Sequence, residues 1–185
     1  DGDPAPWSPL LREVRQIFRG QLVYSANWDH YDKVALWPLV DAVGLSAYFQ
    51  LTEGLRQPSL ERLIHGWREQ RVQISRWRAR TGKPLIFTEL GYHSQDRTNA
   101  FPWDESTDKP VNLAEQADCL RAFWRVFHDA RYLRGLYLWN WFGWGGPRSR
   151  EYCPRGKPAA RVICEIFGQT PQRCPARFGA PLDSR

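Results

Sequence analysis

Glu89 is the residue best placed in the sequence to do chemistry. It ends the short apolar run 84–88, which has the length and composition of a buried strand, and an aromatic-containing segment, 90–93, follows it. A carboxylate at the end of a buried strand is costly to keep in a fold unless it has a chemical task. Glu89 is therefore a candidate catalytic group, and the alternative is a structural ion-pair partner of an arginine.

Aromatic rings crowd a second strand end. The strand-like run that ends at Trp139 opens into a loop that contains Trp141, Trp144 and several glycines. Rings this close together in the sequence are difficult to bury at once, so at least one of them is expected at a binding surface. A carboxylate beside indole rings is typical of proteins that handle sugars.

The chain alternates between helical and strand-like patterns, which is typical of parallel strands joined by helical crossovers. The sequence predicts helices over 8–19, 58–81, 112–130 and 157–167, and strands over 22–26, 42–47, 84–89 and 135–139. Gly20 is expected to end the first helix. The polar and aromatic clusters follow the C-terminal ends of the strands, where parallel α/β folds bind their ligands. His30 and His93 also lie in strand-end loops, where a histidine is more often solvated than bound to substrate.

Alternation along the strands predicts which side chains share a face. If Glu89 points inward, a period of two places Leu85 and Phe87 inward as well. The matching inward residues of the preceding strand are Gly44 and Ser46. Small side chains at those positions make room for large ones opposite.

The composition predicts one globular domain, or part of one. Of the 185 residues, 42% are hydrophobic and 14% aromatic, which indicates a packed core rather than a disordered chain. The sequence contains no Met, so the chain is expected to be processed or cut from a longer one. No run approaches the roughly 18 apolar residues of a membrane span, and the start lacks a signal-peptide pattern, although a signal removed earlier is an alternative.

The formal net charge of +6 would suit a nucleic-acid or anionic partner. However, the basic residues are mostly arginines that are spread along the predicted helices rather than gathered in one basic arm. This pattern favours solvated helix faces, so no nucleic-acid partner is expected.

The cysteines do not predict a metal site. Cys119, Cys153, Cys164 and Cys174 show neither Cys-x-x-Cys spacing nor a zinc pattern with histidine. The last three lie near the C-terminus, so one disulfide there would suit a secreted or periplasmic protein, but spacing leaves the pairing open. No metal or other cofactor is expected.

At these residues the chain resembles the retaining (β/α)8-barrel glycoside hydrolases of clan A, and most closely family 113, whose known members are β-1,4-mannanases. The resemblance rests on 22–28, the strand end at Tyr48, 87–92, the strand that ends at Trp139, and 156–159. In order and spacing these pieces are similar to strands five to eight of the barrel. The resemblance implies an α/β fold in which residues 1–168 form the C-terminal half of a TIM barrel and 169–185 form a tail.

The resemblance also implies roles for individual residues. Glu89 matches the nucleophile that ends strand seven and attacks the anomeric carbon. Tyr48 matches the tyrosine that hydrogen-bonds this nucleophile, and Trp139 matches the aromatic floor of the site that holds the cleaved sugar. The residues implied to contact substrate are Tyr48, Trp139, Asn27, Trp28, Trp141 and Tyr92.

One family feature has no counterpart in this sequence. The general acid/base of the family is a Glu at the end of strand four, and the chain begins after that point; Asp1 and Asp3, the only acids before Trp7, lie at no strand end. Retaining hydrolysis needs two carboxyl groups about 5–5.5 Å apart. The chain alone is therefore expected to be inactive and to need the N-terminal half of the barrel, because four strands alone also expose two edges.

Three functions are consistent with the sequence. The first is a retaining glycoside hydrolase that acts on a β-linked polysaccharide such as β-mannan. The second is a non-catalytic remnant of such a barrel that still binds carbohydrate through its aromatic rings. The third is an unrelated α/β protein that binds anions through its arginines.

Overall fold

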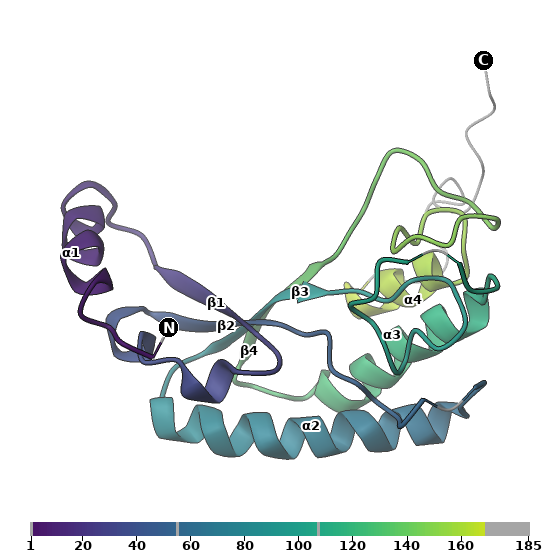
Figure 1. Ribbon diagram of the computed structural model, residues 1–185, viewed down its shortest axis with the longest axis horizontal. Coiled ribbons are helices and arrows are strands. Elements are labelled where there is room, and N and C mark those ends of the chain that lie inside the picture. The colour runs from purple at the N-terminus through teal and green to yellow at the C-terminus, as the bar shows by residue number, and fades with distance from the viewer. Residues whose placement is uncertain (1, 55, 107, 169–185) are drawn as a thin grey trace. The chain divides into compact units, whose positions relative to one another are not determined.

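The computed structural model describes residues 2–54, 56–106 and 108–168, and the tail predicted over 169–185 lies outside the described residues. The elements in chain order are α1 (Trp7–Ile17), β1 (Val23–Asn27), two short 3-10 helices (Tyr31–Lys33 and Trp37–Leu39), β2 (Ala42–Ser46), α2 (Leu60–Thr81), β3 (Leu85–Leu90), α3 (Leu113–Phe127), β4 (Leu133–Leu138) and α4 (Ala159–Ile166) (Figure 1). Each predicted helix and strand is present.

The four strands form one sheet in the order β1-β2-β3-β4. β1 runs parallel to β2, and β2 runs parallel to β3, so helical connections return the chain to the same end of the sheet each time. The prediction of an α/β fold with a parallel sheet is confirmed.

The chain forms two compact units. Unit 1 comprises 1–47, 72–90 and 130–137, and therefore contains α1, the C-terminal turns of α2 and nearly all of the sheet. Unit 2 comprises 48–71, 91–129 and the chain from 138 on, and therefore contains the loops that follow β2, β3 and β4 together with α3 and α4.

An irregularity in β3 decides the direction of Glu89. Leu45 pairs with Phe87, but the next residue of β2, Ser46, pairs with Glu89, so Thr88 is an extra residue in β3. Because this β-bulge interrupts the alternation, Glu89 shares a face with Ser46, and Phe87 lies on the opposite face. The prediction that Phe87 faces the same side as Glu89 is wrong for this reason.

The face opposite Glu89 is the buried face of the sheet. Val43, Leu45, Leu85 and Phe87 are register neighbours there and are all 0% exposed. The prediction that Leu85 faces inward with Glu89 is wrong for the same reason, because Leu85 lies on the face of Phe87. These four side chains form the apolar centre of unit 1.

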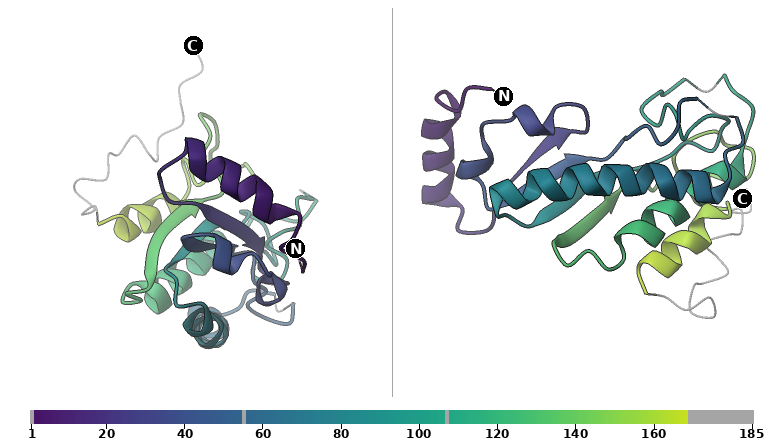
Figure 2. Two further views of the ribbon diagram at one scale, coloured as in Figure 1. Left: turned by 90° about the vertical axis from the view of Figure 1, so that its left-hand side faces the viewer. Right: turned by 90° about the horizontal axis from the view of Figure 1, so that it is seen from below.

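The C-terminal turns of α2 lie along the sheet and complete this core (Figure 2). Ile74 and Trp77 are buried, and the Trp77 ring meets the rings of Tyr31 and Trp37 edge-on, with centroids 4.7 and 5.3 Å apart. Such edge-to-face pairs add a modest stabilisation beyond the area that they bury. The segment between β1 and β2 is thereby fixed to α2.

Gly44 makes room on the face that carries Glu89, as the sequence predicts. A Cβ added there would lie 2.7 Å from the Tyr24 carbonyl oxygen and 2.9 Å from Cγ2 of Thr88. Since no side chain stands between them, Thr88 of β3 reaches across β2, and its hydroxyl hydrogen-bonds the hydroxyl of Ser25 in β1.

The first helix differs from its prediction in two respects. α1 ends at Ile17, and Phe18 is already extended, so Gly20 lies beyond the end of the helix and does not cap it. None of its residues is buried, and Ile17 is 88% exposed. Arg15 forms an ion pair with Asp41 at 2.5 Å, and a hydrogen bond from the Leu22 amide, followed by this arginine, lowers the pKa of the Asp41 carboxyl.

Unit 2 has its own aromatic core. The Trp67 ring of α2 packs edge-on against Phe123 and Phe127 of α3, with centroids 5.3 and 5.7 Å apart, and against Phe49 at 5.8 Å. This core holds the loop that leaves β2, because Phe49 belongs to that loop.

Candidate active site

In unit 1 the structure brings Asn27 and Glu89 to the same edge of the sheet. Asn27 pairs with Ser46, and Ser46 pairs with Glu89, so the two predicted site residues flank one serine at the C-terminal ends of three adjacent strands. The carbonyl oxygen of Glu89 accepts a hydrogen bond of 2.7 Å from the Ala47 amide, which fixes its backbone. Asn27 is exposed, Glu89 is half-buried, and Trp28, also half-buried, begins the turn after β1.

In unit 2 the structure places Tyr48 in an aromatic cluster. The ring of Tyr48 lies edge-on to Tyr152, with centroids 6.2 Å apart, and the imidazole of His93 lies 3.9 Å from the same tyrosine ring. The hydroxyl of Tyr152 donates a hydrogen bond of 2.6 Å to the Pro102 carbonyl oxygen. Sequence reasoning missed Tyr152, because it lies in an irregular loop with no periodic pattern around it.

Trp139 and Trp141, which the sequence predicts at the site, lie in the loop after β4 and are 43% and 39% exposed. The peptide bond between Trp139 and Asn140 is cis. A Cβ added at Gly91 would overlap the carbonyl oxygen of Trp139, so the segment after β3 and the start of the loop after β4 touch backbone to backbone. Only glycine permits this approach.

Gly91→Ala is therefore expected to destabilise the protein by about 2–3 kcal/mol, because the added methyl group must displace the Trp139 backbone. Gly143→Ala is the matched control, since no atom lies within 4 Å of a Cβ at that position. The midpoint of urea unfolding measures both variants. Equal midpoints for the two variants would contradict the close approach.

Tyr92 is placed differently from the other predicted site residues. It is 1% exposed, and its hydroxyl lies near Trp67 and Cys119 in the core of unit 2. Burial raises the pKa of this phenol well above its usual value. Its position favours packing over contact with a ligand.

A buried lysine links two of the loops that carry predicted site residues. The Lys157 ammonium donates hydrogen bonds to the Ser94 hydroxyl, at 2.7 Å, and to the Glu151 carbonyl oxygen, at 2.8 Å. Ser94 belongs to the loop after β3 and Glu151 to the loop after β4. The lysine is 3% exposed, and burial lowers its pKa to about 8.

Glu115 links the loops after β2 and β3. Its carboxylate, 5% exposed, accepts hydrogen bonds from the Arg97 amide at 3.1 Å, the Asn99 amide at 3.0 Å, and the Asn99 and Asn112 side-chain amides at 2.6 and 3.1 Å. The Asn99 carbonyl oxygen in turn accepts from the Leu51 amide at 2.8 Å. Sequence reasoning missed this residue, although Asn112 followed three residues later by Glu115 is a capping-box pattern that could have found it.

His93 is buried, contrary to the expectation of a solvated loop histidine. It is 1% exposed, and neither ring nitrogen has a hydrogen-bond partner among the residues that the structure describes. Asp104, Lys109 and Lys157 are the charged groups around it, but burial is the largest effect and lowers its pKa from 6.5 to about 4. His93 is therefore neutral at pH 7.

The free energy of unfolding is expected to fall by roughly 3 kcal/mol as the pH drops from about 6.5 to 4. In this range the histidine is protonated in the unfolded chain, whereas buried His93 stays neutral in the folded protein. Above pH 6.5 this contribution is constant. Urea unfolding at intervals of half a pH unit measures the slope. His93→Gln should flatten it and His128→Gln, at an exposed position, should not; the same slope in both variants would contradict this assignment.

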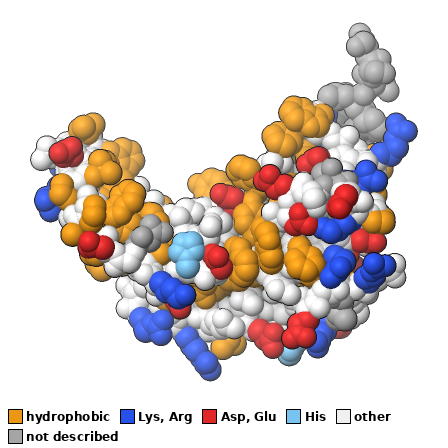
Figure 3. Space-filling view, viewed as in Figure 1, with side chains coloured by type: hydrophobic (Ala, Val, Ile, Leu, Met, Phe, Trp, Pro, Cys, Tyr) orange, Lys and Arg blue, Asp and Glu red, His pale blue; other side chains and the backbone are white. Residues whose placement is uncertain are grey.

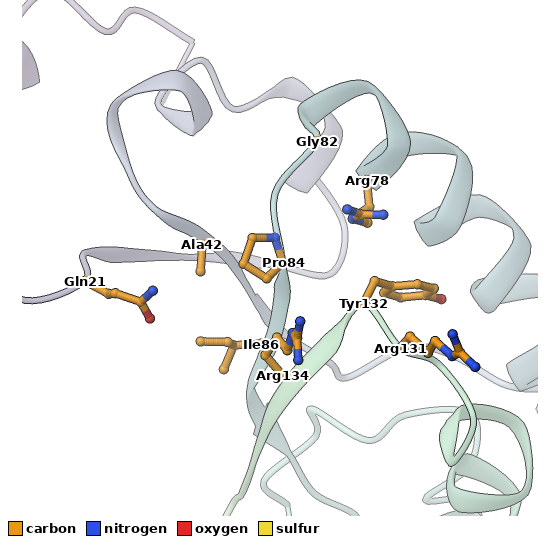
Figure 4. Close-up of a pocket in the computed structure, with 9 residues that line it drawn as sticks. All are labelled: Gln21, Ala42, Arg78, Gly82, Pro84, Ile86, Arg131, Tyr132 and Arg134. Carbon is orange, nitrogen blue, oxygen red and sulfur yellow. The ribbon is translucent and has the colours of Figure 1, made fainter.

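A cavity of about 780 Å³ lies in unit 1 at the opposite end of the strands (Figure 4). Ala42 begins β2 and Pro84 precedes β3, and both line this cavity together with Arg78, Arg131 and Arg134. No predicted site residue and no carboxylate belongs to its lining. It is therefore separate from the edge that carries Glu89.

The described part of the chain shows no group of three or more His, Cys, Asp or Glu side chains that could hold a metal ion. None of the helices described is both long enough and apolar enough to cross a membrane. Cys119 and Cys153 are buried free thiols, whereas Cys164 is disulfide-bonded. Cys174 lies outside the described residues.

The sequence and the fold are similar to those of known glycoside hydrolases. The family model for Glycoside Hydrolase Family 113 matches residues 1–148. The solved structure of the family 113 β-mannanase AaManA from Alicyclobacillus acidocaldarius, in complex with ManMIm, is 28% identical with a TM-score of 0.75, and the match covers 89% of this chain and 50% of that one. A family 113 β-1,4-mannanase matches at 24% identity and a TM-score of 0.76, over 89% of this chain and 50% of that one.

A more distant structure shares the fold alone. The β-glucuronidase from Ruminococcus gnavus is 15% identical, with a TM-score of 0.58, and the match covers 88% of this chain and 28% of that one. No curated protein sequence matches. The chain spans about half the length of the family 113 structures that it matches, and it belongs to glycoside hydrolase family 113.

Proposed function

We propose that this chain supplies the nucleophile of a retaining glycoside hydrolase that cleaves a β-linked polysaccharide of the β-mannan type. Family membership supports the class of enzyme, and the β-mannanases among the similar structures support the class of substrate. The observation that carries the proposal is the position of Glu89, which the bulge in β3 turns to the face of Ser46 and Asn27 at the C-terminal edge of the sheet.

In the proposed reaction the Glu89 carboxylate attacks the anomeric carbon and forms a glycosyl-enzyme ester as the bond to the leaving oxygen breaks. A second carboxyl group protonates that oxygen and then removes a proton from the water that hydrolyses the ester. We place this second group at strand four of the barrel, as the family resemblance implies. Glu89 returns to its free carboxylate at the end of the cycle.

The remaining predicted site residues serve this step by binding and orientation. As the family resemblance implies, we assign to Tyr48 a hydrogen bond to the nucleophile and to Trp139 stacking beneath the sugar that is cleaved. Asn27, Trp28 and Trp141 contact neighbouring hydroxyl groups and ring faces. Tyr92 supports the loop after β3 from the core of unit 2.

We further propose that residues 1–168 form the C-terminal half of a (β/α)8 barrel, with strands five to eight, and that this half acts only together with the N-terminal half. The similar structures of family 113 are about twice as long as the matched part of this chain. β1 and β4 end the strand order, so each has an unpaired edge within the described sheet. Leu10, Ile17 and Val23 are apolar and 49%, 88% and 40% exposed, which suits surfaces that the other half would cover.

The test compares this chain with the complete barrel, in which it is joined to the N-terminal half. The complete barrel is expected to hydrolyse β-mannan and to release first the β-anomer of the product, as proton NMR would detect; the chain alone is expected to be inactive. Initial release of the α-anomer would contradict a retaining nucleophile. Comparable activity of the chain alone would contradict the need for the other half.

A non-catalytic carbohydrate-binding remnant is the second candidate, favoured by the exposed rings of Trp139, Trp141 and Trp144. It predicts that the complete barrel binds mannan without hydrolysing it. The same assay therefore separates the two functions.

A further inference from the structure

Trp144 is the most exposed tryptophan of the chain. Its side chain is 66% exposed and stacks on the ring of Phe142, with centroids 4.6 Å apart and planes 6° apart. Figure 3 shows hydrophobic side chains gathered on the loop that follows β4. The proposed hydrolase reaction gives this ring pair no role, and the pairing of Phe142 with Trp144 has not been used above.

The loop holds the ring pair in place through its backbone. The Cys153 thiol, 1% exposed, accepts a hydrogen bond of 3.3 Å from the Phe142 amide and donates one of 3.1 Å to the Trp144 carbonyl oxygen. Beyond Trp144, the Gly146 amide donates to the Arg155 carbonyl oxygen at 2.8 Å. The backbone of the loop is therefore anchored on both sides of the indole, which holds the ring pair in a fixed place on the loop.

The surroundings of the indole suit a small, flat ligand. Gly143 and Gly145 flank Trp144 in the sequence and add no side chain beside it. Phe142 stacks on one face of the indole, and the Trp144 side chain is still 66% exposed, so the ring offers a surface of the size that one sugar ring can cover. A stable protein interface buries roughly 800 Å² on each partner, far more than one ring face supplies.

We propose that Phe142 and Trp144 form a sugar-binding subsite that stacks on the C–H face of one hexopyranosyl unit of a β-linked oligosaccharide. The subsite is additional to the contacts proposed around Glu89, and its choice of ligand rests on the proposed function. Trp139 and Trp141, already assigned to substrate, precede it in the same loop, so a single oligosaccharide is the occupant that continues this run of rings. The ligand gains stacking and burial of apolar area, and the preformed ring pair loses little side-chain entropy.

The experiment uses the complete barrel with β-1,4-mannohexaose as the probe, carries Glu89→Gln to keep the oligosaccharide intact, and follows the indole N–H signals by NMR. Mannohexaose at millimolar concentration is expected to shift the Trp144 signal, and Trp144→Ala to weaken binding about tenfold. Trp7→Ala, which removes a 39% exposed indole from α1, is the matched control and should leave the affinity unchanged. Circular dichroism checks that both variants keep the fold.

A second pair of variants tests the anchoring of the ring pair. Cys153→Ser retains a donor and an acceptor and should bind mannohexaose as the parent barrel does, whereas Cys153→Ala should bind several-fold more weakly. An unshifted Trp144 signal, or equal affinities for Trp144→Ala and the parent barrel, would overturn the proposal. So would a Trp144→Ala variant that unfolds at a lower urea concentration than the parent barrel while its oligosaccharide affinity is unchanged, because the ring would then pack against protein.

The subsite and the proposed catalytic role can fail separately. Attack by Glu89 on a short activated mannoside needs only the sugar next to that residue, so it does not involve Trp144. If Glu89 reacts and Trp144→Ala has no effect on binding, the subsite proposal is contradicted and the hydrolase proposal stands. If Glu89 does not react and Trp144→Ala weakens binding, the nucleophile assignment is contradicted and the subsite proposal stands.

Discussion

Glu89→Gln in the complete barrel is expected to lower kcat on β-mannan by roughly 10³-fold or more while the fold is retained. The amide has nearly the same shape as the carboxylate but cannot attack the anomeric carbon. Glu89 is half-buried, at the end of a strand whose backbone is fixed by the Ala47 amide, so the substitution changes one oxygen without disturbing the packing. Steady-state rates of mannan hydrolysis measure the effect.

Glu69→Gln is the matched control for this experiment. Glu69 lies on α2 with its side chain 61% exposed, where it pairs with His65 one helical turn earlier. The same change of carboxylate to amide there should leave kcat unchanged. Glu89→Gln activity within about tenfold of the parent enzyme would exclude Glu89 as the nucleophile.

Glu115→Ala is expected to lower the free energy of unfolding by about 3–4 kcal/mol. The substitution leaves four donors, on Arg97, Asn99 and Asn112, without their carboxylate acceptor. Because the carbonyl oxygen of Asn99 holds the Leu51 amide, the loop after β2 should also lose its attachment. Urea unfolding measures the first effect, and hydrogen exchange at the Leu51 amide measures the second.

Two other variants make this prediction specific. Glu115→Gln keeps the shape and one acceptor oxygen, so its loss should be intermediate. Glu105→Ala removes an exposed carboxylate from the loop after β3 and should change the stability by less than about 0.5 kcal/mol. A loss below about 1 kcal/mol in Glu115→Ala would mean that this carboxylate does not organise the loops.

The order of helices and strands could be predicted because local patterns specify it. The apolar spacing of α2 and the short apolar runs of β2 and β3 are visible in the sequence, and each ends where glycine or a polar residue intervenes. Glu89 could be singled out in the same way, since its position at a strand end depends only on neighbouring residues. Periodicity is a local signal, and these are local features.

The direction of side chains in β3 could not be read from periodicity. An extra residue, Thr88, separates Phe87 from Glu89 in the ladder, and the pairing with Leu45 and Ser46 reveals it. Its position depends on Gly44, which lets Thr88 reach the hydroxyl of Ser25 in β1. A contact across three strands leaves no periodic trace in any one of them.

Most of the buried polar network in the loops could not be predicted from the sequence for a related reason. In the sequence Glu115 resembles a solvated helix residue, Lys157 an exposed residue at the start of a helix, and His93 a surface loop residue, yet all three are buried. Their burial depends on partners up to 63 residues away, such as Ser94 for Lys157. These residues hold the loops in place, whereas the sequence patterns singled out the side chains that are proposed to contact the ligand.

The covalent intermediate is the most direct test of the proposed chemistry. The complete barrel would be incubated with an activated 2-deoxy-2-fluoro mannoside, whose fluorine slows hydrolysis of the glycosyl-enzyme, and the labelled peptide would be mapped by mass spectrometry. We expect the label on the side chain of Glu89. A label on any other residue, or turnover without a trapped ester, would contradict the assignment of Glu89 as the nucleophile.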